Sequence, residues 1–97
     1  MTEDATLFTL RLYVAGEAQN SQAAIANLHD ICERFLPARH RIELIDVLRE
    51  PQRALGDGVM MTPMLIKLTP LPVRKIVGSL SETGVVLQAL GLPAPAA

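Results

Sequence analysis

A proline interrupts a run of apolar residues in the second half of the chain, at Thr62-Pro63. The run extends from Val59 to Met61 before this pair and from Met64 to Ile66 after it. Because proline has no backbone N–H, it cannot donate to a sheet ladder and is rare inside a buried strand. We therefore expect a strand to begin directly after Pro63. Cis peptide bonds occur almost exclusively before proline, so a proline in such a place sometimes marks a cis bond.

The composition fits one small folded domain with an aliphatic core. Of the 97 residues, 49% are hydrophobic and 20% are charged, whereas only 3% are aromatic. This balance is typical of a globular chain rather than a disordered one. We expect a single domain over residues 1–97, with frayed tails at 1–5 and 93–97.

Charge and hydropathy argue against two classes of partner. The formal net charge of −1 gives no support for binding nucleic acid. No apolar run approaches the roughly 18 residues of a transmembrane helix, so we expect no membrane partner. The acidic start of the chain lacks the pattern of a signal peptide, and we expect a cytoplasmic location.

Cysteine and histidine are too sparse for the usual redox and metal sites. Cys32 is the single cysteine of the sequence, so a Cys-x-x-Cys pair is excluded. It lies on the apolar stripe of a predicted helix, where we expect a small buried side chain. His29 and His40 match no spacing of metal ligands. With no catalytic triad, phosphate-binding glycine loop or supported carboxylate pair, we expect no enzyme activity, no cofactor and no metal.

Hydrophobic periodicity predicts a strand, a helix and a second strand in the first half of the chain. Residues 6–14 and 41–48 have strand patterns, and the helix between them follows Asn20-Ser21 and ends near Leu36. Asn20 and Ser21 are residue types that cap helices. Leu44 and Ile45 are adjacent and apolar, which predicts burial on both faces of the second strand, as in a parallel pair.

The second half of the chain predicts a short helix, a β-hairpin and a last helix. These elements are a short helix from Pro51 that Gly56-Asp57-Gly58 ends, strands at 64–68 and 73–77 joined by a turn at 69–72, and a helix at 82–90 between Ser81 and Gly91. Ser81 is the expected cap of this last helix. The predicted fold class is therefore α/β, with the order βαβαββα.

Six short blocks stand in register from about Thr9 to Leu92. They are Arg11–Gly16, Asn20-Ser21, Ile45–Leu48, Pro51-Gln52, Thr62-Pro63, and Leu71–Gly78 with Leu80-Ser81. Together they resemble the KaiB family of circadian clock proteins. The family is metamorphic, and the predicted order βαβαββα is its thioredoxin-like fold. In that fold we expect the Thr62–Pro63 bond to be cis. The alternative is its ground state, a tetramer with the order βαββααβ.

The resemblance implies a non-enzymatic clock regulator. Such a protein binds the N-terminal ATPase ring of a hexameric KaiC-type protein, modulates its phosphorylation cycle and switches between two folds. KaiA, or a histidine kinase with a KaiB-like domain as a competitor, are the further partners implied. A monomer is favoured, with a tetramer as the alternative. A thioredoxin-like domain without redox cysteines that binds another partner, such as a stress or signalling ATPase or kinase, is the alternative function.

Two groups of residues are candidates for partner contact. Lys67, Arg74 and Lys75 are brought together by the hairpin, and we expect them to face an acidic partner surface unless they form an ordinary solvated face. The second group lies at the carboxyl end of the second strand, a common recognition edge, with ordinary loop packing as the alternative. This group comprises Leu48, Arg49, Pro51 and Gln52.

A further set of residues is expected to govern the choice of fold, namely Pro63, Pro70, Pro72, Gly78, Ala89 and Gly91. The family commonly has Gly-Leu-Asp where this chain has Ala89-Leu90-Gly91. Alanine stabilises a helix over glycine by about 1 kcal/mol, and Gly91 moves to a position where glycine ends a helix. We therefore expect mainly the thioredoxin-like fold. Gly56-Asp57-Gly58 replaces a more helical stretch, so we expect a weak helix after Pro51.

Overall fold

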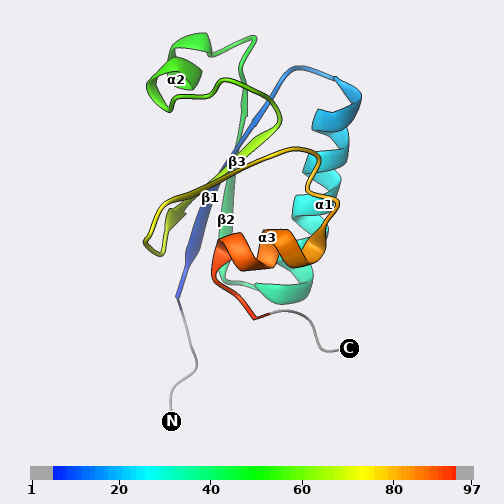
Figure 1. The fold of residues 1–97 in the computed structure, drawn as a ribbon, viewed down its shortest axis with the longest axis vertical. Coiled ribbons are helices and arrows are strands. Elements are labelled where there is room, and N and C mark those ends of the chain that lie inside the picture. The colour runs from blue at the N-terminus through cyan, green and yellow to red at the C-terminus, as the bar shows by residue number, and fades with distance from the viewer. Residues whose placement is uncertain (1–5, 94–97) are drawn as a thin grey trace.

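Seven elements follow one another in the predicted order βαβαββα (Figure 1). The computed structural model describes residues 6–93. Its elements are β1 (Phe8–Val14), α1 (Gln19–Phe35), β2 (His40–Asp46), α2 (Pro51–Gly56), β3 (Met64–Thr69), β4 (Arg74–Val77) and α3 (Thr83–Leu90). The thioredoxin-like order is thus confirmed. Apart from Pro93, which is exposed, the tails expected at 1–5 and 93–97 lie outside the described residues.

The four strands form one mixed sheet in the order β2-β1-β3-β4. β1 pairs in parallel with β2, from Phe8 opposite His40 to Val14 opposite Asp46. β3 runs antiparallel to both β1 and β4, and it forms the predicted hairpin with β4. The parallel β1–α1–β2 unit and the hairpin therefore meet at the centre of the sheet, between β1 and β3.

Alternation along β1 separates two cores on the two faces of the sheet. Phe8, Leu10, Leu12 and Val14 belong to the larger core, which α1 and α3 cover. Figure 1 shows both helices on one side of the strands, with α2 apart from them at the upper end of the sheet. The remaining buried members of the larger core are Ala24, Leu28, Ile31, Cys32, Leu36, Leu65, Leu80, Val86, Leu87 and Leu90. Tyr13 belongs to the smaller core on the other face, with Ile45, Ala54, Met64 and Ile66.

The starts of two helices differ from the prediction. The N-cap of α1 is Ala18, two residues before Asn20, and no side chain caps this helix. Ser21 lies inside the first turn, and its Oγ accepts a hydrogen bond of 3.1 Å from the Ala15 N–H. The N-cap of α3 is Glu82 rather than Ser81. Ser21 thus accepts a hydrogen bond from the loop that precedes α1 and does not cap that helix. Ser81 lies one residue before the N-cap of α3.

The predicted burial of β2 on both faces was wrong. β2 is an edge strand, because β1 is its one neighbour in the sheet order. Ile45 is buried in the smaller core, but the Leu44 side chain on the opposite face is 51% exposed. A parallel pairing was correctly expected, yet parallel pairing does not by itself place a helix over both faces of an edge strand.

Several unusual backbone positions fall at prolines and glycines, and two more, Ala38 and Leu80, are non-glycine residues with positive φ. The Thr62–Pro63 bond is cis, as expected, and so are the bonds that precede Pro70 and Pro72. β4 ends before Gly78, which has a φ of +123° and donates its N–H to the Pro63 carbonyl oxygen at 2.9 Å. Gly91 ends α3 with a φ of +80°, in the left-handed region that glycine occupies most easily.

We predict that Ala89→Gly lowers the free energy of unfolding by about 1 kcal/mol, because glycine costs more backbone entropy inside a helix. Ala89 lies within α3. Gly84→Ala in the same helix is the matched control, since a Cβ at Gly84 meets nothing within 4 Å. Gly84→Ala should stabilise the fold by a similar amount. Urea unfolding measures the free energy of unfolding of each variant relative to the unmodified chain. A change of the same sign in both variants would contradict the prediction that both positions are helical.

Candidate protein-interaction surface

Tyr13 anchors the segment that contains α2 to the sheet. Its side chain is fully buried in the smaller core, pointing away from α1 and α3. The Tyr13 hydroxyl lies 2.5 Å from Asp57 Oδ2 and 3.1 Å from the Arg53 carbonyl oxygen, both of which are acceptors. Arg53 lies in α2 and Asp57 is its C-cap residue. The hydroxyl therefore joins the centre of the sheet to the end of the short helix.

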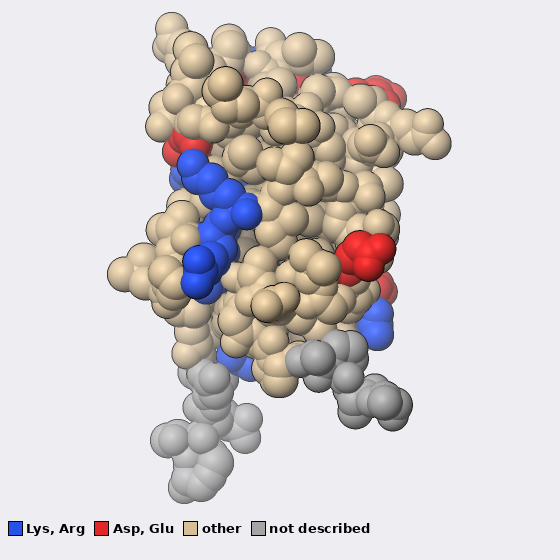
Figure 2. Space-filling model, viewed as in Figure 1, with Lys and Arg blue, Asp and Glu red and all other residues tan. Residues whose placement is uncertain are grey.

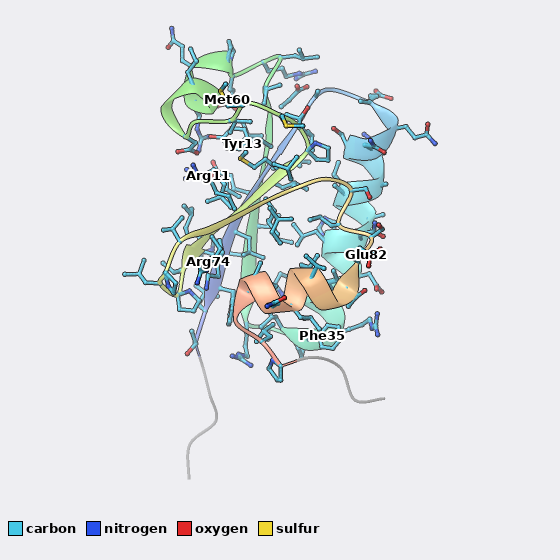
Figure 3. The ribbon with its side chains drawn as sticks, in the orientation of Figure 1. Arg11, Tyr13, Phe35, Met60, Arg74 and Glu82 are labelled. Carbon is cyan, nitrogen blue, oxygen red and sulfur yellow. The ribbon has the colours of Figure 1, made fainter. Side chains whose placement is uncertain are left out.

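Charged side chains extend this contact across β1 and β2. Arg11 Nη1 lies 2.9 Å from Asp57 Oδ2, and its Nε lies 2.9 Å from Glu43 Oε1. Arg53 Nη2 lies 2.8 Å from Glu43 Oε2. Arg11 and Glu43 are opposite each other in the parallel register, so both side chains stand on the α2 face of the sheet. We call Arg11, Tyr13, Glu43, Arg53 and Asp57 the Asp57 cluster; Figure 3 labels Arg11 and Tyr13 beneath α2.

Contacts within the Asp57 cluster shift the pKa values of its members. A hydrogen bond from Tyr13, and then the hydrogen bond and charge of Arg11, lower the pKa of Asp57. Hydrogen bonds from Arg53 and Arg11 lower the pKa of Glu43. Burial, together with the Asp57 carboxylate, raises the pKa of Tyr13 to about 12. At neutral pH the cluster therefore holds two carboxylates, two guanidinium groups and a neutral phenol.

Leu48 stands out from a loop that is itself tightly held. Asp46 Oδ1 accepts hydrogen bonds from the Gly16 N–H at 3.1 Å and the Leu48 N–H at 2.9 Å. A Cβ on Gly16, whose φ is +55°, would lie 3.3 Å from Leu48 Cδ1, so the leucine packs closely over this glycine. Even so, the Leu48 side chain is 71% exposed. Arg49, Pro51 and Gln52 are also exposed, as expected for residues that contact a partner.

Three more apolar side chains are exposed beside this loop, and the sequence did not single them out. Leu55 lies in α2, and Met60 and Met61 lie in the loop that follows it. Their exposed fractions are 78%, 89% and 62%, respectively. With Leu48 they make four exposed apolar side chains on α2 and its two flanking loops, which we call the α2 surface. Figure 3 labels Met60 at this end of the molecule.

The basic residues of the hairpin do not share one face. Lys67 is opposite Arg74 in the register, whereas Lys75 is opposite Ile66, which belongs to the smaller core. Lys75 therefore points to the α2 face, where its Nζ donates to the Asp57 carbonyl oxygen at 2.8 Å. Lys67 points to the other face and is buried, and Arg74 is exposed. Figure 2 shows basic side chains in a strip beside the hairpin.

Cys32 is buried in the larger core, as the sequence predicted. Burial is the main cause that raises its pKa to about 11, so the thiol is a poor nucleophile at neutral pH. Within residues 6–93, no three side chains of the metal-binding types come together. Among these same residues, no helix is both long enough and apolar enough to cross a membrane.

Comparison with known proteins supports the resemblance found in the sequence. A model of the KaiB domain matches residues 11–92. The chain is 44% identical over 89 residues to the circadian clock protein KaiB3 of Synechocystis sp., covering 92% of this chain and 87% of that protein. It is 42% identical over 85 residues to the circadian clock oscillator protein KaiB of Prochlorococcus marinus, covering 88% and 75%.

Solved structures with little sequence identity share the fold. The N-terminal domain of Synechococcus elongatus SasA superposes with a TM-score of 0.73 at 20% identity, over 94% of this chain and 90% of that domain. Mitochondrial thioredoxin 3 of Saccharomyces cerevisiae gives a TM-score of 0.72 at 16% identity, over 90% and 80%. At these identities the likeness establishes the thioredoxin-like fold alone.

We predict that the Asp57 cluster makes the fold sensitive to acid. The pKa values of Asp57 and Glu43 are lower in the folded chain than in the unfolded chain, where they are about 4. The two carboxylates therefore stabilise the fold above about pH 5, and this stabilisation is lost as the pH falls through their lowered pKa values. Unfolding measured between pH 7 and pH 3 should show this loss.

Asp57→Asn should flatten the dependence of stability on pH below about pH 5, because one of the linked carboxyls is gone. Asp30→Asn is the matched control, since Asp30 forms an exposed pair with Arg34 on α1, away from the cluster. This control should keep the slope of the unmodified chain. Equal slopes in all three proteins would show that Asp57 is not linked to folding.

Proposed function

The chain belongs to the KaiB family, and we propose that it is a non-enzymatic clock regulator that binds the N-terminal ATPase ring of a KaiC-type protein. In this proposal, binding modulates the phosphorylation cycle of that ATPase. The match to the family over residues 11–92 and the clock relatives at 42–44% identity support it. The observation that carries the binding role is the exposed α2 surface, because exposed apolar side chains that gather on one part of a protein mark interaction sites, whereas single ones do not.

The α2 surface has the physical properties of a preformed binding site. Its backbone is fixed before any partner arrives, because the Asp57 cluster holds α2 and Asp46 holds the Leu48 loop. Binding then costs less conformational entropy than it would on a loose loop. Leu48 and Met60 offer flexible aliphatic side chains that can pack into a complementary surface. Arg49 and Gln52 form the polar rim of the same site in this proposal, and the exposed Pro51 ring lies between them.

We assign the basic hairpin residues a different part in binding. Exposed Arg74 adds positive charge that steers an acidic surface toward the chain and raises the association rate. Lys75 contributes through its charge while its hydrogen bond to Asp57 keeps it on the α2 face. Lys67 is buried and adds to the positive field without direct contact with a protein partner.

The absence of a second cysteine supports a binding role over a redox role. Thioredoxin-type reduction needs a thiolate of low pKa, usually in a Cys-x-x-Cys pair at a helix start. The single thiol here is buried, near the opposite end of α1, and has a raised pKa. The proposed setting is the cytoplasm. KaiA, or a histidine kinase with a KaiB-like domain as a competitor, completes the proposed set of partners.

The binding role predicts a specific loss in Leu48→Ala. Truncating this 71%-exposed side chain should weaken binding to a KaiC-type ring by about tenfold, mainly through faster dissociation, while leaving the fold intact. Surface plasmon resonance with the ATP-bound ring measures both rates. Leu71→Ala is the matched control, because Leu71 is 76% exposed but lies in the hairpin turn, away from α2. Equal effects of the two variants would argue against the α2 surface.

We also propose that the chain can switch between two folds and mainly populates the thioredoxin-like one when free. α3 supports this bias, since Ala89 lies inside the helix and Gly91 ends it. Solution NMR of the free chain should give helical shifts over residues 82–90, and size-exclusion chromatography should show a monomer. Strand shifts in this segment together with a tetramer would reverse the proposed bias.

A further inference from the structure

The strand β4 forms one open edge of the sheet. In the strand order its single neighbour is β3, and within residues 6–93 no other segment pairs with its outer side. An open strand edge presents N–H and C=O groups with which another extended chain can pair. The edge is therefore a place where an extended peptide segment can add to the sheet.

The register of the hairpin identifies the backbone groups that face outward. The Gly78 N–H donates at 2.9 Å to the carbonyl oxygen of the residue before β3, so Gly78 turns its backbone toward β3. Backbone groups alternate in direction along an antiparallel pair. Ile76 and Arg74 therefore also turn their backbone groups toward β3. Those of Val77 and Lys75 point to the open edge, and each of these two residues can exchange a pair of hydrogen bonds with an added antiparallel strand.

A pocket of about 230 Å³ lies beside this edge, between β4 and the start of α3. Ile76 stands on the α3 face of the sheet, because its partner in the register, Leu65, belongs to the larger core. Ile76 lines the pocket together with Val85 of α3, whose side chain is 54% exposed. The buried side chains of Leu80 and Val86 add to the apolar lining. The pocket can therefore take an aliphatic side chain from a strand that pairs with β4.

Arg74 places a positive charge on the same face of the sheet, two residues before Ile76. Its side chain is exposed, and within the described part of the chain its guanidinium group has no hydrogen-bond or ion-pair partner. Figure 3 labels Arg74 on the hairpin and Glu82, which lines the pocket at the start of α3. The charge beside the edge therefore changes sign between these two residues, and an acidic side chain is favoured at the Arg74 end.

A second copy of this chain would fit this edge poorly. Pairing of two β4 strands would bring a second Arg74 and a second Lys75 to the same four-residue edge. Like charges opposite each other on neighbouring strands are destabilising, and charged side chains on edge strands oppose self-association. The same charges attract an acidic residue of a different chain.

We propose that β4 binds an extended peptide segment that carries an aliphatic residue and, two residues later, an acidic residue. The segment pairs antiparallel with β4, which is the slightly more stable arrangement and gives this order of the two residues. The aliphatic side chain lies opposite Ile76 and enters the pocket, and the acidic side chain lies opposite Arg74. Both are non-hydrogen-bonded pairs, in which opposite side chains approach most closely. The pocket lies on the α3 face, away from α2, and the proposal does not rest on the function proposed above.

A short peptide tests the proposed specificity. The probe is the capped peptide acetyl-Ser-Thr-Ile-Thr-Glu-Thr-Ser-amide, which carries the aliphatic and the acidic residue at the required spacing. In NMR titrations of the full chain at constant ionic strength, it should shift the amide signals of Lys75, Val77 and Val85 saturably. Replacing its Glu by Lys, or its Ile by Ser, should weaken binding by about tenfold or more, because the ion pair or the apolar contact is lost.

Methylation of single peptide nitrogens separates strand pairing from attraction of charge alone. The Thr between Ile and Glu lies opposite Lys75, so its N–H donates to the Lys75 carbonyl oxygen in the proposed pairing. Methylation of this nitrogen should weaken binding by about fivefold or more. Methylation of the Ile nitrogen is the matched control, because that N–H points away from β4, and the affinity should be retained.

Arg74→Gln tests the residue that selects the acidic side chain, and this variant should bind the probe about tenfold more weakly. Arg41→Gln is the matched control, since Arg41 is an exposed arginine on β2 at the opposite edge of the sheet. It should bind the probe as the unmodified chain does. Equal binding by the two variants, equal binding of the Glu and Lys peptides, or equal effects of the two methylations would overturn the proposal. A dimer of the free chain whose Lys75 and Val77 signals change on dilution would identify a second copy as the occupant and would also overturn it.

Discussion

The hydrogen bond between the Tyr13 hydroxyl and Asp57 is the contact on which the α2 side of this fold depends. α2 has only six residues and no side-chain cap at its start, so its own helical stability is slight. The phenol joins the end of this helix to the central strand, and Arg11 and Glu43 extend the attachment to β2. Without this attachment, the exposed leucine and methionine side chains beside α2 would have no fixed arrangement to offer a partner.

The two faces of the sheet therefore have different physical characters. On one face, α1 and α3 bury an aliphatic core that includes the single thiol. On the other face, a small apolar core supports a cluster of paired charges and the short helix. A thioredoxin-like fold without a redox cysteine pair can thus present a surface for contact with another protein. Membership of the KaiB family is consistent with this division.

Local signals in the sequence were sufficient for most of the architecture. Pro63 marked the start of β3, Gly91 marked the end of α3, and periodicity over most of their length indicated β1 and α1. The failures concern long-range placement. Leu44 was expected to be buried, but a strand pattern does not reveal that its strand lies at an edge. Lys75 was grouped with Lys67, although an odd spacing along the hairpin puts the two on opposite faces.

The candidate site was predicted only in part. The exposed group from Leu48 to Gln52 followed from its place after a parallel strand, a general property of such sheets. The Asp57 cluster was missed, because its members are separated by up to 46 residues and meet only when β1 pairs with β2 and α2 packs on the sheet. One signal was available, since Arg11 and Glu43 have opposite charges at matching positions of the two predicted strands. Asp57 itself was interpreted only as part of a weak helix end.

The central claim is that α2 and its flanking loops, held by the Asp57 cluster, form the surface that meets a KaiC-type ring. The most direct measurement is an NMR titration of the labelled chain with the ATP-bound N-terminal ring. The account predicts that the signals of Leu48, Gln52, Leu55 and Met60 broaden first, while those of the exposed Asp30 and Arg34 on α1 stay unchanged. Selective broadening along α1, or no change at any signal, would contradict it.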